Sequence, residues 1–319
     1  MDNRITLREA VTDRDIAHFW HEMDQMLLRD VRANCDLGTP MTDEEAAHFL
    51  SPDYRSRIDS FAQRAENPVR RFFFLAGGQE VGFACYCTYH TEDGKCFILD
   101  YCIYPPYRCR GLGRQCFAAL AGWAAEEGAR YFELNTHCLR AKRFWEGLGF
   151  HCNGYDDGGT ILLCRPPEER VPITVERLTD PGDADLGWQL HKLENGFSIE
   201  IGEAPPCEAA WDRLCQAIVD GRITFFLARR GYRAVGMCSV SRCFSTFACS
   251  DIGVFDDFFV EPVFRRQGIP RQLAAAAQAW CKANGLASLT VGSSPGDVGM
   301  YRSLGFTAEL GTMLACPLT

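Results

Sequence analysis

The chain has 319 residues, of which 47% are hydrophobic and 24% are charged, as is typical of a globular protein with about two domains. Its net charge of −9 argues against a nucleic-acid-binding protein and suits a cationic substrate such as an amine. The polar N-terminus lacks the apolar region of a signal peptide, and no apolar stretch is long enough to span a membrane. We therefore expect a soluble cytoplasmic protein with neither nucleic acid nor membrane as a partner.

The sequence holds 17 cysteines, a high and odd number. They are scattered, with no Cys-x-x-Cys pair and no spacing typical of a zinc site. Several lie inside apolar runs, including Cys85, Cys87, Cys102 and Cys116. Because cysteine behaves as a small apolar residue and thiols stay reduced in the cytosol, we predict free and largely buried cysteines, and no metal site.

In the first half, a short strand precedes a long helical region at about residues 13–67. Two strands follow, joined by a tight turn at Gly77-Gly78, and a further strand at 99–103 leads into an arginine-rich loop. A helix with an apolar side comes next, and its apolar residues recur at helical spacing: Leu112, Cys116, Leu120 and Trp123. Another strand and a short helix, which ends at a Leu-Gly-Phe sequence with glycine as its cap, complete the half.

The second half repeats these features in the same order. Six short segments match in register: residues 5–8 with 173–176, 73–76 with 225–228, 81–82 with 235–236, Arg108-x-x-Gly111 with Arg265-x-x-Gly268, Trp123 with Trp280, and 148–150 with 304–306. A single short match would carry little weight, but matches that keep their order indicate a duplicated domain. The alternation of strands and helices predicts a mixed α/β (α+β) domain that is built twice.

The two halves are joined by the segment 165–170, which is rich in proline and charge as an exposed connector should be. We predict an N-terminal domain at 1–165, a linker at 166–172 and a C-terminal domain at 173–319.

The arginine-rich loop reads Arg108-Cys109-Arg110-Gly111-Leu112-Gly113 and lies between a strand and the start of a helix. Backbone N–H groups at a helix start lack helical partners, and the helix dipole adds partial positive charge, so this arrangement binds phosphate. The glycines let the backbone approach a pyrophosphate closely, and arginine side chains can add charge-assisted hydrogen bonds. The alternative is a solvated basic turn before a helix.

The loop fits the pattern Arg/Gln-x-x-Gly-x-Gly/Ala, and together with the later Leu148-Gly149-Phe150 it resembles the GNAT acetyltransferase superfamily, once in each half. The resemblance implies a mixed central sheet that is splayed open and flanked by helices. It also implies that acetyl-CoA is the acyl donor, with its pantetheine arm in the gap and its pyrophosphate on the loop. The cofactor-binding residues that it implies are Cys102, Ile103, Arg108, Cys109, Arg110, Gly111, Leu112, Gly113 and Arg114.

The second loop, Arg265 to Pro270, departs from this pattern at its last position. Proline has no N–H, so one phosphate donor is lost, although proline is tolerated in the first turn of a helix. We therefore expect the first half to carry the acyl-CoA site and the second to be a weakened copy.

The resemblance also implies direct attack of an amine on the thioester, with a carboxylate base on the strand before the loop. Asp100 occupies that place, and strand alternation puts it on one face with Cys102 and opposite Tyr101 and Ile103. A hydrogen-bonded structural aspartate is the alternative. Asp257 is the matching residue of the second half.

The family's usual acid is a tyrosine four residues before the glycine of the closing Gly-Phe. This is Tyr301 in the second half, whereas the first half has Trp145, whose indole cannot protonate a thiolate. The better loop and the tyrosine therefore lie in different halves. Either the first half binds acyl-CoA and the second has become structural or acceptor-binding, or the second half is the active one.

We predict an acetyl-CoA-dependent N-acetyltransferase that acts on a primary amine, in a small molecule or a peptide, as a monomer or homodimer. The alternative is a degenerate tandem protein that binds acyl-CoA or a protein partner without catalysis. The acceptor is not encoded in any motif, because acceptor sites in this family are built from variable segments such as residues 13–67.

Overall fold

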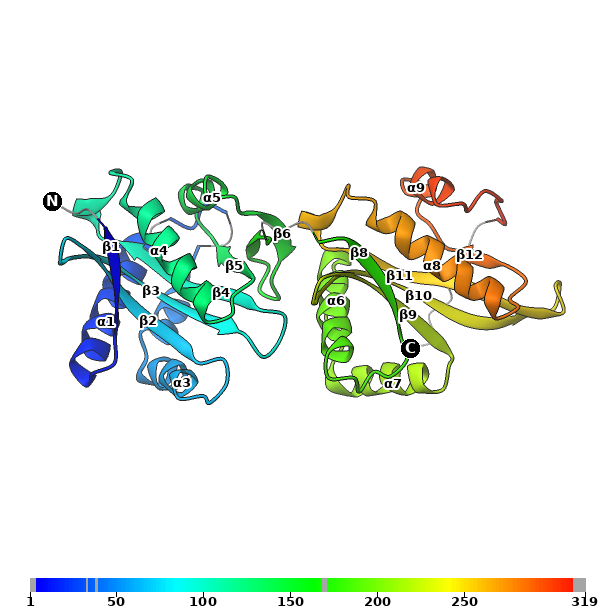
Figure 1. Cartoon of the computed structure of the whole chain (residues 1–319), viewed down its shortest axis with the longest axis horizontal. Coiled ribbons are helices and arrows are strands. Elements are labelled where there is room, and N and C mark those ends of the chain that lie inside the picture. Colours follow the sequence, from blue (N-terminus) through cyan, green and yellow to red (C-terminus); the bar gives the residue numbers. More distant parts are fainter. Residues whose placement is uncertain (1–3, 33, 38–39, 168–170, 312–319) are drawn as a thin grey trace. The chain divides into compact units, whose positions relative to one another are not determined.

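A computed structural model describes residues 4–32, 34–37, 40–167 and 171–311 (Figure 1). The chain divides into two units, Met1–Glu169 and Arg170–Thr319, and each is described by itself. The predicted linker includes residues 168–170 and the predicted C-terminal domain includes 312–319, which lie outside the described residues, so the predicted extents stay a prediction. In the described part, no helix has the length and apolar character needed to cross a bilayer, and the cytoplasmic location also stays a prediction.

The first unit is built around one mixed sheet. Its elements in chain order are β1 (Ile5–Glu9), α1 (Asp13–Met26), η1 (Leu27–Val31), α2 (Asp43–Phe49), α3 (Pro52–Ala62), β2 (Val69–Ala76), β3 (Gln79–Tyr89), β4 (Lys95–Ile103), η2 (Pro105–Tyr107), α4 (Leu112–Glu126), β5 (Tyr131–Thr136), α5 (Leu139–Glu146), β6 (His151–Tyr155) and β7 (Ile161–Arg165). The strand order is β1-β2-β3-β4-β5-β7-β6. The neighbouring strands β4 and β5 pair in parallel, and each of the other neighbouring pairs in this order is antiparallel.

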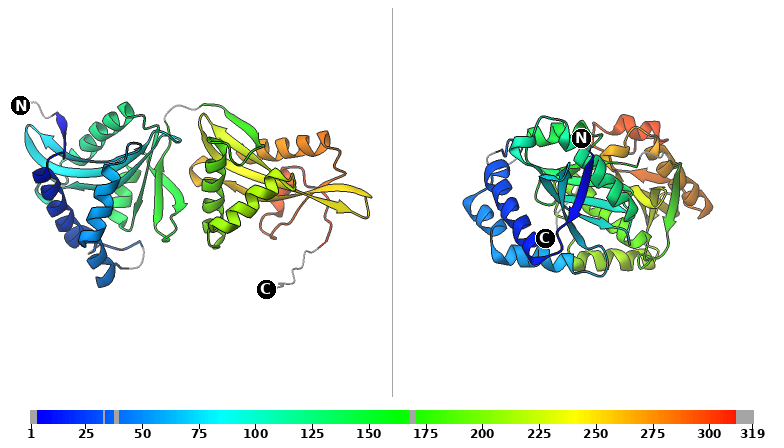
Figure 2. Two further views of the ribbon diagram at one scale, coloured as in Figure 1. Left: turned by 90° about the horizontal axis from the view of Figure 1, so that it is seen from below. Right: turned by 60° about the vertical axis from the view of Figure 1, so that its left-hand side comes forward.

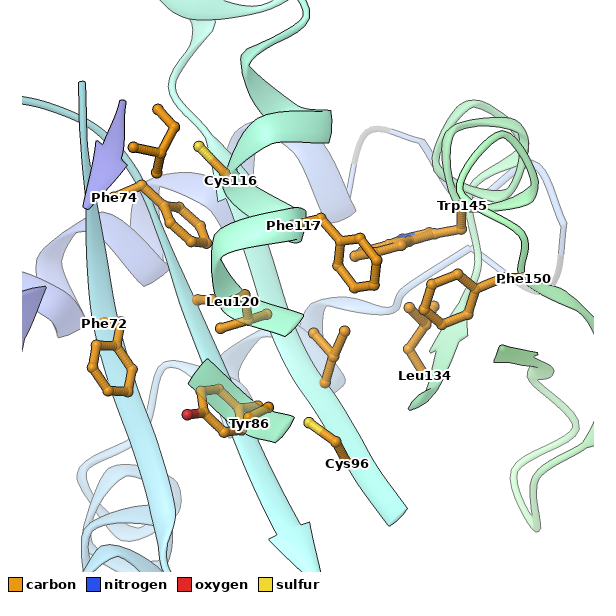
Figure 3. Close-up of a cluster of buried hydrophobic side chains, with 14 of the residues drawn as sticks. Phe72, Phe74, Tyr86, Cys96, Cys116, Phe117, Leu120, Leu134, Trp145 and Phe150 are labelled. Atoms are coloured by element: carbon orange, nitrogen blue, oxygen red, sulfur yellow. The ribbon is translucent and has the colours of Figure 1, made fainter. Parts of the chain in front are cut away.

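The two faces of this sheet have separate cores. Helix α4 packs on one face, where the rings of Phe117, Trp145 and Phe150 meet edge to face at centroid distances of 5.1–5.5 Å (Figure 3). Helices α1 and α3 pack on the other face (Figure 2). The buried stripe of α4 is formed by Cys116, Phe117, Leu120 and Ala124.

One detail of the predicted elements needs correction, and another becomes more specific. Trp123 was predicted on the buried side of α4, but it is 39% exposed, because the stripe is centred on Phe117 and Leu120 and Trp123 lies at its edge. Besides the π-helical segment η1, the region predicted as helical at about 13–67 holds three α-helices among its described residues, which leave out 33, 38 and 39. Each begins at its own cap, where the side chain of Thr12, Thr42 or Ser51 accepts a backbone N–H.

The cysteines inside apolar runs are buried as predicted, and Cys85, Cys87, Cys102 and Cys116 are each at most 3% exposed. The turn at Gly77-Gly78 is also confirmed, since both glycines have positive φ between β2 and β3.

The second unit repeats the plan over its described residues. Its elements are β8 (Ile173–Leu178), α6 (Leu186–Ile201), α7 (Glu208–Val219), β9 (Ile223–Arg230), β10 (Arg233–Ser245), β11 (Ser250–Val260), η3 (Pro262–Phe264), α8 (Ile269–Ala283), β12 (Leu289–Val291) and α9 (Val298–Ser303). The strand order is β12-β11-β10-β9-β8, with β11 and β12 parallel. Helix α8 covers one face, and α6 and α7 cover the other (Figures 1 and 2). The predicted mixed α/β class, built twice, is confirmed.

Candidate functional site

In the first unit the sheet opens between its two parallel strands. β4 and β5 pair only from Lys95↔Tyr131 to Phe97↔Glu133, whereas β4 continues to Ile103. On its other side β4 stays paired with β3, with Leu99 as an extra residue between the pairs Ile98↔Tyr86 and Asp100↔Cys85. Such a bulge bends the strand away from its neighbour. The edge of β4 from Ile98 to Ile103 therefore faces a gap where another extended chain can add.

The loop after β4 bends sharply through two left-handed residues. The 3₁₀ turn η2 (Pro105–Tyr107) is followed by Cys109 with φ of 60° and Gly111 with φ of 78°. Gly111 caps the N-terminus of α4. Cysteine rarely adopts this conformation, and strained backbone of this kind often marks functional sites.

The loop leaves a row of amides free. Among the described residues, the backbone N–H groups of 109–114 donate to no protein acceptor, and the first amide that is bonded again is that of Gln115, to the Gly111 carbonyl at 3.4 Å. Free amides at a helix start form a cradle for an anion. These residues therefore fit a bound pyrophosphate, as the sequence predicted for residues 108–113.

The side chain of Arg108 is held inside the protein. Its Nε donates to the carbonyl of Ile103 at 2.6 Å, and its two terminal nitrogens donate to Asp30 at 2.8 and 2.6 Å. Asp30 lies in η1, a π-helical segment that continues α1. Burial raises the pKa of Asp30, but the hydrogen bonds from Arg108 and Arg29 outweigh burial and the net shift is downward. Arg108 thus fixes the loop to the first helix through a bidentate ion pair.

Asp30 was missed by sequence reasoning. It is 78 residues away from Arg108 in a segment without a motif. A loop arginine needs a counter-charge if it is partly buried, but nothing in the sequence indicates which of the many carboxylates supplies it.

The other predicted cofactor residues differ in what they offer. Cys102 is 3% exposed and lies on the α1 face, where burial raises the pKa of its thiol to about 11, so only its backbone borders the gap. Ile103 packs on the α4 face. Cys109 and Arg110 are exposed, and Arg114 donates to the Gly147 carbonyl at 3.0 Å. Leu112 and Gly113 form the first turn of α4.

Asp100 is a half-buried carboxylate on the open part of β4. Cys102, which strand alternation places on the same face as Asp100, belongs to the core on the α1 side. Tyr101 and Ile103 pack on the opposite side of the sheet, against α4, as alternation predicts. In the described chain, no hydrogen bond or ion pair holds the Asp100 side chain. The alternative prediction, that Asp100 is a structural residue held by hydrogen bonds, therefore has no support. Burial raises the pKa of Asp100 to about 7, which suits a general base near neutral pH.

In the described part of the first unit, Trp145, Tyr101 and Tyr104 are buried or hydrogen-bonded, so none of these three residues is free to act as a general acid. Trp145 is 5% exposed and is packed in the core. The hydroxyl of Tyr101 donates to the Gly113 carbonyl at 2.6 Å, and that of Tyr104 donates to Glu80 at 2.6 Å. Both hydroxyls are therefore engaged, and burial raises the pKa of both.

The second unit holds a loop of the same conformation. Arg266 has φ of 60° and Gly268 has φ of 80°, which match Cys109 and Gly111. Arg265 donates to the Val260 carbonyl at 2.9 Å and pairs with Glu200 at the end of α6. These two contacts match those that Arg108 makes with a carbonyl of the preceding strand and with Asp30. The difference is Pro270, which removes one amide from the row.

The second unit also opens beside its loop. β11 and β12 pair only from Gly253↔Leu289 to Phe255↔Val291, and β11 continues to Val260 with Asp257 in the open part. Tyr301 is half-buried on α9, where its ring lies 6.2 Å from Phe258. Burial raises the pKa of Tyr301, and nearby Asp297 and Asp256 add to the shift.

Comparison with known proteins gives matches in both halves. The profile of a family described as "Acetyltransferase (GNAT) family" matches residues 38–150, and that of "Acetyltransferase (GNAT) domain" matches residues 205–312. None of the curated proteins matches the chain.

Several solved structures are similar to part of the chain. An aminoglycoside acetyltransferase from an uncultured soil metagenomic sample, in complex with sisomicin, has 19% identity and a TM-score of 0.41, covering 46% of this chain and 96% of its own. A predicted acetyltransferase with acetyl-CoA from Clostridium acetobutylicum has 13% identity and a TM-score of 0.39, covering 46% and 96%. Glucosamine-6-phosphate N-acetyltransferase from Arabidopsis thaliana has 12% identity and a TM-score of 0.38, covering 46% and 99%.

Proposed function

Because the chain belongs to the GNAT acetyltransferase family, with two domains of that family in tandem, we propose that its first unit transfers an acetyl group from acetyl-CoA to a primary amine. The observation that carries this proposal is the row of free amides at residues 109–114 beside the open edge of β4. The negative net charge of the chain suits an acceptor that is cationic before it reacts.

The residues of the first unit divide the work. The amides of 109–114 hold the pyrophosphate, and the open edge of β4 holds the amide-containing arm of the cofactor. Acetyl-CoA supplies the thioester whose acetyl group is transferred. Arg108 does not contact the phosphates through its side chain, which is occupied by Asp30, and it acts by fixing the loop.

Asp100 is the group that we assign to proton removal. Aliphatic amines are mostly protonated at neutral pH, so a base has to accept a proton before or during attack. With its pKa raised to about 7 by burial, Asp100 is ionised often enough to accept that proton and basic enough to hold it. Trp145 cannot act as the acid, so we propose that the thiolate leaves without a protein acid in the first unit. Tyr301 stays the candidate acid of the second unit.

Calorimetric titration with acetyl-CoA tests the assignment. Gly111→Glu places a carboxylate at a left-handed position in the middle of the cradle, where a Cβ meets no other atom within 4 Å. We expect the wild-type chain to bind and this variant to lose about a hundredfold in affinity, because like charges in contact cost several kcal/mol. Gly268→Glu is the matched control at the same place in the second loop, and we expect it to keep the wild-type affinity.

Each other outcome has a definite meaning. If the wild-type chain does not bind acetyl-CoA, the proposed function is wrong. If Gly268→Glu removes binding and Gly111→Glu does not, the cofactor site lies in the second unit. Thermal unfolding of both variants shows whether a loss of binding comes from a loss of fold.

A further inference from the structure

The segment that leads into the first loop is tied to the body of the first unit by a tyrosine. Tyr104 follows β4 directly and caps the turn η2, and its backbone N–H donates to the Val81 carbonyl at 2.9 Å. Its hydroxyl donates to Glu80 Oε1 at 2.6 Å. Burial, and then the contact with Glu80, raise the pKa of Tyr104, so the hydroxyl keeps its proton and stays a donor at neutral pH.

Glu80 connects this tyrosine to the first helix. It lies near the start of β3, and its Oε1 is also 2.8 Å from Nε2 of His18, which belongs to α1. Its Oε2 accepts from Arg8 Nη2 at 3.1 Å. The ring of His18 stacks on that of Phe73 at a centroid distance of 5.0 Å. Both oxygens of Glu80 are therefore held, and Tyr104 meets a fixed acceptor.

The first loop is thus attached to one helix on both sides of η2. Tyr104, before the turn, reaches α1 through Glu80 and His18. Arg108, after the turn, reaches η1, the continuation of α1, through Asp30. The free amides of 109–114 begin directly after the second attachment. The placement of these amides therefore depends on α1.

The second unit attaches the matching residue by different chemistry. Glu261 caps the turn η3, and its N–H donates to the Val235 carbonyl at 3.0 Å, as that of Tyr104 donates to β3. The Glu261 carboxylate contacts Arg233 at the start of β10 and lies 3.7 Å from Lys192 Nζ on α6. Here the loop side supplies the carboxylate and the strand supplies a cation, yet strand, turn and first helix are joined in the same way.

Both loops contain a residue that needs such support. Cys109 and Arg266 each have φ of 60°, a conformation that is unfavourable for a side chain with a Cβ. Backbone of this kind persists only when its surroundings fix it. Attachments before and after the turn supply that restraint in each unit, and they place it next to the amides at the start of the following helix.

We propose that Glu80, together with His18, is a positioning residue for acyl-CoA binding: it holds Tyr104, and through Tyr104 the loop, in the conformation whose amides accept the pyrophosphate. This role rests on the proposed function, because it concerns the same loop. Neither Glu80 nor His18 touches the cofactor. They raise the fraction of the chain whose loop is competent to bind, and apparent affinity falls in proportion to that fraction.

Calorimetric titration of the full chain with acetyl-CoA is the main test. Tyr104→Phe removes the hydroxyl and keeps the ring, and we expect the Kd to rise about fivefold as the competent fraction falls to about one fifth. Glu80→Ala should have the same effect. Glu80→Gln should lose less, because its amide oxygen can still accept from Tyr104. The double variant Tyr104→Phe/Glu80→Ala should bind no more weakly than either single variant, because both changes break one contact.

Tyr86→Phe is the matched control. The Tyr86 hydroxyl donates to Glu127 Oε2 at 2.9 Å, at the end of α4 farthest from the loop. This change also removes a hydrogen bond from a tyrosine to a glutamate in the first unit, so it should lower the thermal stability by a similar amount. Because the bond does not hold the loop, the affinity for acetyl-CoA should stay at the wild-type value.

Hydrogen exchange supplies a readout that needs no ligand. The N–H groups of Tyr107 and Arg108 donate to the carbonyls of Tyr104 and Pro105 at 2.9 and 3.3 Å. If Glu80 holds this turn, these two amides should exchange faster in Tyr104→Phe and Glu80→Ala than in wild type, and at the wild-type rate in Tyr86→Phe. On addition of acetyl-CoA, exchange in α1 should slow in wild type and less so in Tyr104→Phe.

The outcomes separate this role from the proposed function. Wild-type affinity in both Tyr104→Phe and Glu80→Ala would overturn the positioning role and leave the proposed function intact. An equal loss of affinity in Tyr86→Phe would assign the effect to stability and would also overturn it. A double variant that binds more weakly than both single variants would mean that Glu80 does not act through Tyr104. If the wild-type chain does not bind acetyl-CoA, the proposed function is wrong and the positioning role falls with it.

Discussion

Two loops with the same backbone differ in the groups around them. Cys109 and Gly111 in the first unit have φ of 60° and 78°, and Arg266 and Gly268 in the second have 60° and 80°. Both loops are fixed by an arginine that donates to the preceding strand and pairs with a carboxylate at the end of the first helix. The backbone has the same shape in both loops, but the groups along it differ, since the first loop has its full row of amides and the second has Pro270 in place of one of them.

This comparison shows that the loop conformation tolerates the loss of one backbone amide. Pro270 fits the first turn of α8 because the N–H that it lacks has no helical partner there. Folding therefore places little restraint on that position, whereas phosphate binding does. Three measurements, ordered by expected effect, would break or sharpen the contrast between the units.

The largest effect is expected for Asp100→Asn. If Asp100 accepts the proton of the amine, the variant should lose about a hundredfold or more in the rate of amine-dependent CoA release, since general bases contribute about 10²–10⁴. Asp257→Asn, the matching change in the second unit, should leave this rate unchanged. A thiol-release assay over a panel of primary amines measures both.

The pH profile supplies the control for this prediction. Below pH 7 the raised pKa leaves Asp100 protonated and unable to act as base. Ionisation of Asp100 should therefore add a rise of about tenfold per pH unit to wild-type kcat/KM up to about pH 7, beyond the rise that follows ionisation of the amine. Asp100→Asn should lack this rise and keep only the one that follows ionisation of the amine. If Asp257→Asn lost as much turnover as Asp100→Asn, the two units would not differ as proposed.

An intermediate effect is expected for Asp30→Asn. The change removes the charge that holds Arg108, and we expect the KM for acetyl-CoA to rise about tenfold, because a charged hydrogen bond contributes about 1.5–3 kcal/mol. kcat should change much less, because Arg108 positions the loop and does not touch the reacting atoms. Glu200→Gln is the matched variant of the second unit, and steady-state kinetics should show no change. A fall in kcat with an unchanged KM would contradict a positioning role.

The smallest effect is expected for Pro270→Ala. Measured in a chain that also carries Gly111→Glu, the change restores one amide to the second loop and should strengthen acetyl-CoA binding about fivefold, which corresponds to one hydrogen bond of about 1 kcal/mol. Calorimetry measures the gain. An unchanged or weaker affinity would mean that the missing amide is not what distinguishes the second loop.

Much of this architecture is predictable from local pattern. The two strands joined at Gly77-Gly78, the loop at 108–113 and the repetition of both halves follow from glycine positions, apolar spacing and repeated residue order, which are properties of short segments. The placement of Asp100 opposite Tyr101 likewise follows from the alternation of a strand.

The remaining features depend on contacts between distant segments. The pairing of Arg108 with Asp30 and that of Arg265 with Glu200 join residues on different elements, and no spacing rule connects them. The exposure of Trp123 shows a subtler limit, because helical spacing fixes which residues share a side but leaves the centre of the buried stripe undetermined by about one residue.

The gap beside β4 has a consequence for hydrogen exchange. Beyond Phe97 the strand has no partner on its β5 side in the described structure, so backbone amides on that edge are open to water although they lie inside a sheet. Deuterium should enter them faster than it enters the edge that pairs with β3. A ligand that occupies the gap should slow this uptake along 98–103 and leave the rest of the sheet as it was, so the strand itself reports occupancy.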